Sequence, residues 1–214
     1  MKFRKKLSLF VSFLFFLGFL VLFYGVRVDA QWLRELDYFG NEIFRLDVSR
    51  EFSQTVFDFT HIGSLRNLFF VALLIGAILL YKKEIFSFFW FGITGALMGG
   101  VIPLTLKNTI RRPRPTDGLM ARVGYSFPSG HAMGTLALYG LIIILAAVYI
   151  KKIWLRYTIM ISSLAIILIV SWSRIHLGVH YLSDILGSMF LGISLLIAAW
   201  VVLMHFRKKR ERSL

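Results

Sequence analysis

The chain has 214 residues, of which 57% are hydrophobic, and its mean hydropathy is +0.73. A soluble domain of this length is more polar, so the composition is that of an integral membrane protein. The absence of cysteine excludes a disulfide framework and a thiolate metal site. The formal charge of +14 comes without a compact basic motif interleaved with aromatic residues, so we expect no nucleic-acid partner.

Six apolar segments are long enough to span a bilayer, which takes about 20 residues. They are predicted near Leu7–Val26, Ile62–Tyr81, Ile85–Leu106, Ala132–Ile150, Ile153–Trp172 and Ile185–Phe206. The short link Lys82–Glu84 makes the second and third spans an antiparallel hairpin. We therefore expect an all-α fold, a six-transmembrane-helix bundle in which residues 1–214 form one integral membrane domain. Nothing in the sequence indicates an obligatory protein partner.

The first span has two interpretations. The basic stretch MKFRKK, the apolar run and then Val28-Asp29-Ala30 resemble a secretory signal with its cleavage site. The apolar core runs for about 20 residues, whereas that of a signal peptide usually has about 7–15. We expect an uncleaved anchor helix, with a cleaved signal as the alternative.

Only one connection is long, the segment Arg27–His61. Its stretch LRELDYFGNEIFRLDV mixes apolar and charged residues at near-helical spacing. This pattern predicts one or two short amphipathic helices at the outer membrane interface.

Basic residues predict the orientation, since they gather in cytoplasmic segments. If the N-terminus is cytoplasmic, the inner segments hold fourteen of the 25 lysines and arginines but only two of the eleven acids. We therefore expect a plasma-membrane protein with both termini in the cytoplasm. Three polar clusters then share the outer side: Lys107–Pro115, Pro128–His131 and Ser173–Asp184. Charged side chains at a bilayer are costly, so their convergence indicates a functional site facing outward.

The first cluster is suited to binding an anion. Lys107 and Arg114 combine a point charge with a planar donor fork, the usual pair for a phosphate. Pro113 and Pro115 prevent the helix from continuing and favour an extended backbone. The alternative is that these cations only contact lipid headgroups.

The second cluster has the features of a helix start. Ser129 is a candidate N-cap, Gly130 permits close approach of a ligand, and the helix N-terminus attracts anions. His131 would then lie beside the anion, where it is suited to protonate a departing oxygen. The alternative is a plain capped helix with an interfacial histidine.

The third cluster contains a candidate nucleophile. His180 and Asp184 are four residues apart, and a carboxylate on one ring nitrogen makes the other more nucleophilic. Arg174 adds a cation, whereas His176 has no carboxylate four residues later and is assigned no role. A structural His–Asp hydrogen bond is the alternative. A metal site formed with His131 lacks a close ligand pair.

Together the clusters indicate metal-free phosphoryl transfer, in which one histidine attacks phosphorus and another protonates the leaving oxygen. An anion channel or transporter would need polar residues along both halves of a pathway, and the inner halves of the spans have few. An inactive lipid-binding scaffold would need only the cations.

These residues resemble the three motifs of the type-2 phosphatidic acid phosphatase superfamily of membrane lipid phosphatases. The family pattern is matched in order and spacing by Lys107 with Arg114-Pro115, by Pro128-Ser129-Gly130-His131, and by Ser173-Arg174 with His180 and Asp184. The motif region covers about a third of the chain, and the six spans extend the resemblance to nearly all of it.

The resemblance implies a role for each matched residue. His180 would form a phosphohistidine, Asp184 would support it, and His131 would be the general acid. The implied phosphate ligands are Lys107, Arg114, Ser129, Gly130 and Arg174, and no metal or other cofactor is implied. Implied substrates are phosphatidylglycerophosphate, phosphatidic acid and undecaprenyl diphosphate. Transfer of the phosphoryl group to a second lipid, as in some relatives, is the alternative to hydrolysis.

Overall fold

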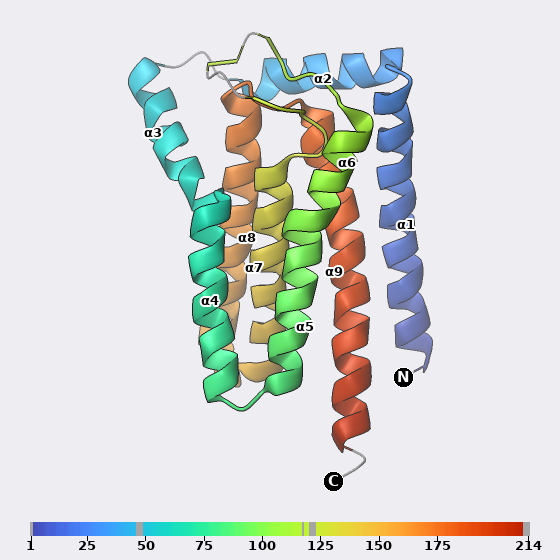
Figure 1. The fold of residues 1–214 in the computed structure, drawn as a ribbon, viewed down its shortest axis with the longest axis vertical. Coiled ribbons are helices and arrows are strands. Elements are labelled where there is room, and N and C mark those ends of the chain that lie inside the picture. Colours follow the sequence, from blue (N-terminus) through green and yellow to red (C-terminus); the bar gives the residue numbers. More distant parts are fainter. Residues whose placement is uncertain (1, 46–48, 117, 120–122, 212–214) are drawn as a thin grey trace.

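The computed structural model describes residues 2–45, 49–116, 118–119 and 123–211, and the regular structure of these residues is helical throughout (Figure 1). The elements are α1 Lys2–Arg27, α2 Gln31–Phe44, α3 Arg50–Thr60, the 3₁₀ turn η1 His61–Gly63, α4 Leu65–Tyr81, α5 Ile85–Ala96, the π-helical segment η2 Leu97–Val101, α6 Ile102–Ile110, α7 Gly130–Tyr149, α8 Ile153–His176 and α9 Leu182–Glu211. The predicted all-α fold is confirmed.

The membrane layout also follows the prediction. Five helical runs are long and apolar enough to cross a bilayer, and a sixth is added if α4 is counted with α3 and η1, to which it is joined at a bend of 42°. Large apolar side chains such as Phe70 on α4 and Ile161 on α8 are more than half exposed, as expected for surfaces that contact lipid. The beginning of α1 and the end of α9 lie at the same end of the bundle (Figure 1).

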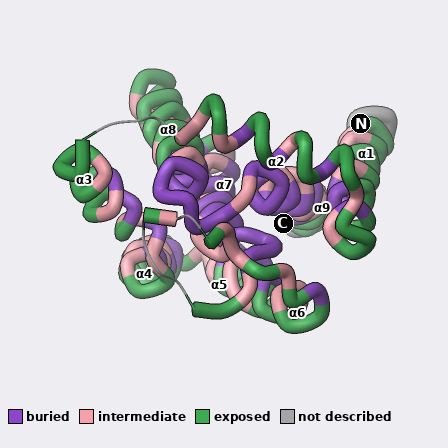
Figure 2. The backbone as a smooth tube through the Cα atoms, turned by 90° about the horizontal axis from the view of Figure 1, so that it is seen from above, coloured by how far each residue is buried: buried purple, intermediate pink, exposed green. Residues whose placement is uncertain are grey.

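Helix α7 occupies the centre of the bundle. In the most apolar 18-residue stretch of α7, 67% of the residues are buried, against at most 39% in any other candidate span. Viewed down the bundle, the buried residues gather in its middle and the exposed ones lie on the outer helices (Figure 2). The main core combines Leu141 of α7 with Trp90 of α5 and Leu203 of α9. Residues in the first half of α7, next to its N-terminus, are therefore enclosed by the surrounding helices.

The third span is irregular where the sequence holds Gly99, Gly100 and Pro103. Its α-helical pattern is interrupted by the π-helical segment η2 before α6 resumes with Pro103 in its first turn. A Cβ atom on Gly99 would lie 3.6 Å from the Cα atom of Gly134, so α7 approaches this backbone closely. A methyl group at this position would already be in van der Waals contact with α7, so the two helices pack closely here.

The long connection forms the two helices that its pattern predicts, although they are arranged differently. Helix α2 lies across the end of the bundle opposite the chain termini (Figure 1). Its buried residues Leu33, Asp37 and Gly40 recur at helical spacing, which marks one face turned towards the bundle. Helix α3 does not lie flat beside α2 but continues through η1 into α4 across the 42° bend.

Candidate active site

The three polar clusters meet at the end of the bundle that α2 covers. Helix α6 ends at Ile110, and its C-cap Arg111, whose backbone is left-handed (φ 56°), turns the chain into a segment without regular structure. Helix α7 begins at Gly130, and α9 begins at Leu182 just after the third cluster. The ends of four spans therefore deliver residues far apart in the sequence to one place, as predicted.

The central feature is the pair formed by His180 and Asp184. The Nδ1 atom of His180 lies 3.2 Å from Oδ2 of Asp184, and the two side chains are 3% and 0% exposed. The carboxylate accepts a hydrogen bond, so the proton resides on Nδ1. On the other side of the ring, Nη1 of Arg114 lies 3.1 Å from Nε2, and a guanidinium only donates. Both contacts favour the tautomer whose Nε2 carries a lone pair, as a nucleophile requires.

The backbone before α9 holds His180 in this position. The amide groups of Val179 and His180 both donate to the carbonyl of Arg174, each at 3.2 Å. Gly178 allows the turn because its φ is +62°, and a Cβ atom there would lie 2.7 Å from the Cα atom of Gly118. Any other residue at position 178 would strain the backbone and collide with the loop that follows α6.

Burial controls the protonation of His180. Removal from water lowers its pKa to about 4. The Asp184 carboxylate opposes this change, while the charges of Arg114 and Lys107 add to it. The imidazole is therefore neutral near pH 7, which is the form able to attack phosphorus.

The lowered pKa of His180 predicts how stability depends on pH. The folded protein binds this proton less readily than the unfolded chain, whose histidine pKa is about 6.5. Stability from the neutral imidazole is thus complete above about pH 6.5 and declines as the pH falls towards 4. We expect the melting temperature of the wild type in detergent to fall further between pH 7 and pH 4.5 than that of His180→Asn. Equal falls in the two proteins would contradict a buried neutral His180.

The cations of the first cluster lie against the other two clusters. The Nζ atom of Lys107 donates to the carbonyls of Tyr125 and Ser126, at 2.6 and 3.1 Å. A Cβ atom on Gly130 would be 3.8 Å from Cε of Lys107, which places this side chain beside the start of α7. Arg114 donates from Nη1 to the carbonyl of Val179 at 2.8 Å as well as facing His180.

The start of α7 is joined directly to the start of α9. Ser129 is the predicted N-cap, and its hydroxyl accepts from the amide of Ala132 at 3.4 Å. The amide of Ser129 donates to Ser188 Oγ at 3.0 Å, and that hydroxyl donates to the carbonyl of Asp184 at 2.7 Å. His131 follows in the first turn of α7 and is half-buried. The helix start and the His–Asp pair are thus parts of one hydrogen-bonded unit.

Arg174 is placed differently from the other cations. It is only 1% exposed, and its Nη1 donates to Oγ1 of Thr60 at 3.1 Å. The Thr60 hydroxyl is also 2.7 Å from that of Ser173. In this geometry Arg174 joins the end of α3 to the site, while its role as a phosphate ligand stays a prediction.

Two functional-site contacts were not predicted from the sequence. Arg112 donates to Asp184 Oδ1 at 2.7 Å and to Asp37 Oδ2 at 2.5 Å, so a carboxylate from α2 becomes part of the site. A signal for Asp37 was available, because it lies four residues after Leu33 on the apolar stripe of α2. Among the residues whose placement is described, no three His, Asp or Glu side chains are grouped so as to hold a metal ion.

The chain is similar in sequence to known membrane phosphatases. The family model of the PAP2 superfamily matches residues 87–210. Phosphatidylglycerophosphatase B of Bacillus subtilis (strain 168) is 32% identical over 143 residues, which cover 64% of this chain and 68% of that protein. Dolichyldiphosphatase 1 of Homo sapiens is 26% identical over 136 residues, covering 58% of this chain and 56% of that one.

Solved structures show the same fold. The crystal structure of a transmembrane PAP2 type phosphatidylglycerolphosphate phosphatase from Bacillus subtilis matches with a TM-score of 0.74 and 25% identity, over 92% of this chain and 96% of that one. LpxE of Aquifex aeolicus matches with a TM-score of 0.55 and 20% identity, over 74% and 91% of the two chains, and shows the fold alone.

The fold and the site define an integral membrane enzyme of the phosphatase class. The chain belongs to the PAP2 superfamily, as its motifs predicted. By family and by its relatives it is a lipid phosphatase.

Proposed function

We propose that this protein hydrolyses a phosphate monoester or diphosphate on a membrane lipid through a phosphohistidine intermediate, without a metal ion. The observation that carries the proposal is the geometry of His180, whose Nδ1 faces Asp184 while its Nε2 faces Arg114. This geometry gives a neutral nucleophile whose reactive nitrogen points at a cation that is suited to bind a phosphoryl oxygen.

The first step transfers the phosphoryl group to His180. The Nε2 lone pair attacks phosphorus, a P–N bond forms, and the bond to the lipid oxygen breaks. His131 donates a proton to that oxygen, so the lipid leaves as an alcohol or as a lipid with one phosphate fewer. Asp184 stabilises the positive charge that develops on the imidazole ring.

The second step releases inorganic phosphate. A water molecule loses a proton to His131 as its oxygen attacks phosphorus, and the P–N bond breaks. His180 returns to its neutral form and His131 to its protonated form, so the cycle closes without a redox change. The histidine that served as acid in the first step therefore serves as base in the second.

Phosphate binding falls to groups at the start of α7 and around it. Lys107 and Arg114 supply charge, and the N-terminus of α7, which Ser129 caps and Gly130 begins, offers the positive end of the helix dipole. Arg174 is the fifth proposed ligand. It would bind a phosphoryl oxygen by exchanging its hydrogen bond to the Thr60 hydroxyl for one to that oxygen. These groups stabilise the charge on phosphorus mainly by being fixed beforehand.

The orientation of the molecule is part of the proposal. The excess of basic residues at the end that holds both termini supports a cytoplasmic location for that end, with the site facing outward. Lipid would then enter from the outer leaflet with its tails in the bilayer.

Cysteine labelling tests this orientation, because the natural chain has no cysteine. We expect Glu35→Cys, on the exposed side of α2, to react in intact cells with a thiol reagent that cannot cross the membrane. Lys82→Cys, in the turn between α4 and α5, serves as the matched control and should react only after the cells are opened. The reverse pattern would invert the topology.

Substrate identity follows from phosphate release by the purified protein in detergent, with a chelator present throughout. The panel comprises phosphatidylglycerophosphate, phosphatidic acid and undecaprenyl diphosphate, and phosphatidylglycerophosphate is expected to be hydrolysed because the relative with 32% identity is named for it. Loss of all activity on adding the chelator would contradict the metal-free mechanism. Transfer of labelled phosphate to a second lipid, with none released, would identify a phosphotransferase instead.

A further inference from the structure

We infer that Asp37 and Arg112 are positioning residues that hold the catalytic carboxylate Asp184 against His180. Asp37 comes from α2 and Arg112 from the segment after α6, and neither belongs to the residues that contact phosphate in the proposed function. The kinetic test of this inference rests on the proposed function, whereas its geometry rests on the hydrogen bonds that Asp37 and Arg112 make.

Arg112 joins two carboxylates through separate nitrogens. Its Nη1 donates to Asp184 Oδ1 and to Ser183 Oγ, both at 2.7 Å, and its Nη2 donates to Asp37 Oδ2 at 2.5 Å. The guanidinium carbon also lies 4.1 Å from the centre of the Tyr181 ring. A planar fork bonded at both tips and stacked on a ring has little freedom to rotate. Its position is therefore set by Asp37 as much as by Asp184.

Asp37 has a second contact that bears on the same carboxylate. Its Oδ1 accepts from the amide of Ser183 at 2.8 Å, and its Oδ2 accepts from the Ser183 hydroxyl at 3.0 Å. Ser183 is the second residue of α9 and directly precedes Asp184. The amides of a first helical turn lack partners within the helix, so a carboxylate from α2 caps α9 where the catalytic residue lies.

The two oxygens of Asp184 consequently have different tasks. Arg112 holds Oδ1, while Oδ2 accepts from His180 and from the amide of Tyr181 at 3.0 Å. Asp37 is 4% exposed, and a buried carboxylate is retained at such a place only when it is paired. The chain of contacts thus runs from α2 to the reactive nitrogen of His180.

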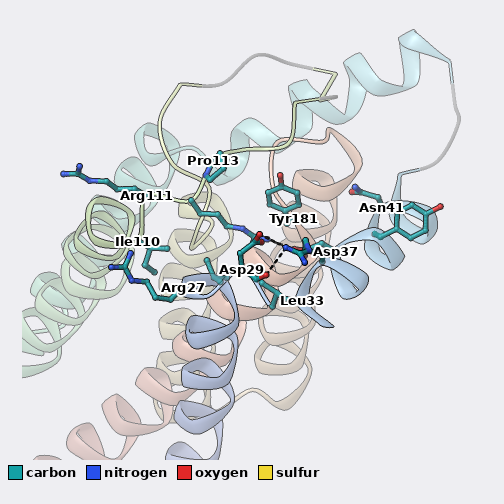
Figure 3. A pocket seen from close by; sticks show the side chains of 13 residues that line it. Arg27, Asp29, Leu33, Asp37, Asn41, Ile110, Arg111, Pro113 and Tyr181 are labelled. Carbon is teal, nitrogen blue, oxygen red and sulfur yellow. Dashed lines mark hydrogen bonds and ion pairs between the residues drawn. The ribbon is translucent and has the colours of Figure 1, made fainter. Parts of the chain in front are cut away.

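Packing alone does not immobilise this region. A cavity of about 590 Å³ lies between the end of α1, α2 and the segment after α6, and Asp37, Arg112 and Tyr181 line it (Figure 3). Side chains beside an open cavity are not confined by close packing. On the cavity side, Arg112 and Asp37 are therefore held by their mutual hydrogen bonds, and Arg112 in turn bonds the fully buried Asp184.

The test compares the kinetics of four variants with the wild type: Asp37→Asn, Arg112→Gln, the double variant, and Asp29→Asn as the matched control. Asp29 lines the same cavity, but its partner is Arg34 and both side chains are more than half exposed. We expect kcat to fall about 10-fold for Asp37→Asn and about 100-fold for Arg112→Gln, with KM within about 2-fold of wild type. The double variant should be no worse than Arg112→Gln, because the pair acts as one unit.

Orthovanadate binding, measured by calorimetry, gives a readout that needs no lipid. As a transition-state analogue it should bind about 10-fold more weakly to Asp37→Asn and unchanged to Asp29→Asn. If the wild type hydrolyses no lipid but vanadate follows this pattern, the proposed function fails and the positioning role stands. Wild-type kcat and vanadate affinity in Asp37→Asn would overturn the inference, as would losses that multiply in the double variant. Should Asp37→Asn not fold, Arg112→Lys replaces it, with the expected fall in kcat at unchanged KM.

Discussion

Replacing His180 with alanine is expected to abolish phosphate release, with a loss of at least about 10⁴-fold in kcat. The variant lacks the nitrogen that forms the bond to phosphorus, so the covalent intermediate of the proposed mechanism cannot form. The measurement is release of inorganic phosphate from the preferred lipid in detergent, with a chelator present.

His205→Ala is the matched control for this variant, because His205 is exposed near the opposite end of α9. It should keep wild-type activity. Both proteins should elute as single species of equal size, so that inactivity cannot be attributed to unfolding. Substantial phosphate release by His180→Ala would remove His180 from the mechanism.

The second large effect is expected for Asp184→Asn, with a fall in kcat of about 10³–10⁴-fold and little change in KM. In serine proteases the equivalent change costs about 10⁴-fold because the histidine adopts the wrong tautomer. Here the new amide can donate to Nδ1, which would place the ring proton on Nε2 and block attack. The ion pair with Arg112 is also lost, which leaves this buried cation with Asp37 as its carboxylate partner.

Steady-state kinetics of Asp184→Asn beside Asp58→Asn test this expectation. Asp58 lies on the exposed side of α3, and its neutral variant should behave as wild type. Because the phosphate ligands remain, KM of Asp184→Asn should stay near the wild-type value. A large rise in KM with unchanged kcat would instead mean that Asp184 serves substrate binding.

The spans and the motifs could be predicted because their signals are local. Long apolar runs specify bilayer-spanning helices through the cost of unpaired backbone groups in lipid, and Ser129 specifies the start of α7 through its capping hydroxyl. His180 and Asp184 are close in sequence, so their contact required only a turn and a helix start. The three clusters were expected to lie together because the number of spans between them places all three on the same side of the membrane.

The contacts of Arg112 could not be predicted in the same way. Asp37 and Ser183 are 146 positions apart, and only the packing of α2 over the start of α9 brings them together. In the sequence, Arg112 is one of several adjacent cations, and its neighbour Arg111 is exposed. Arg111 is exposed and Arg112 is directed into the site because Arg111 caps α6 in a left-handed conformation, which changes the direction of the chain.

Arg174 shows a further limit of the motif pattern. Its place in the motif predicts a phosphate ligand, yet the structure records a contact with Thr60 from the end of α3. A motif specifies residue types and spacing, whereas the partner of a long flexible side chain depends on distant segments. The position of α3 relative to the site is set by Val56, Leu177 and Val179, which form a small cluster of their own.

Capture of the covalent intermediate tests the central claim most directly. The wild type is mixed with lipid carrying labelled phosphate, quenched in base within one turnover, and digested for peptide mapping. We predict an acid-labile, base-stable label on the peptide that contains His180, which disappears on longer incubation as phosphate is released. Phosphate release at the wild-type rate with no label on the protein at any time would contradict the phosphohistidine mechanism.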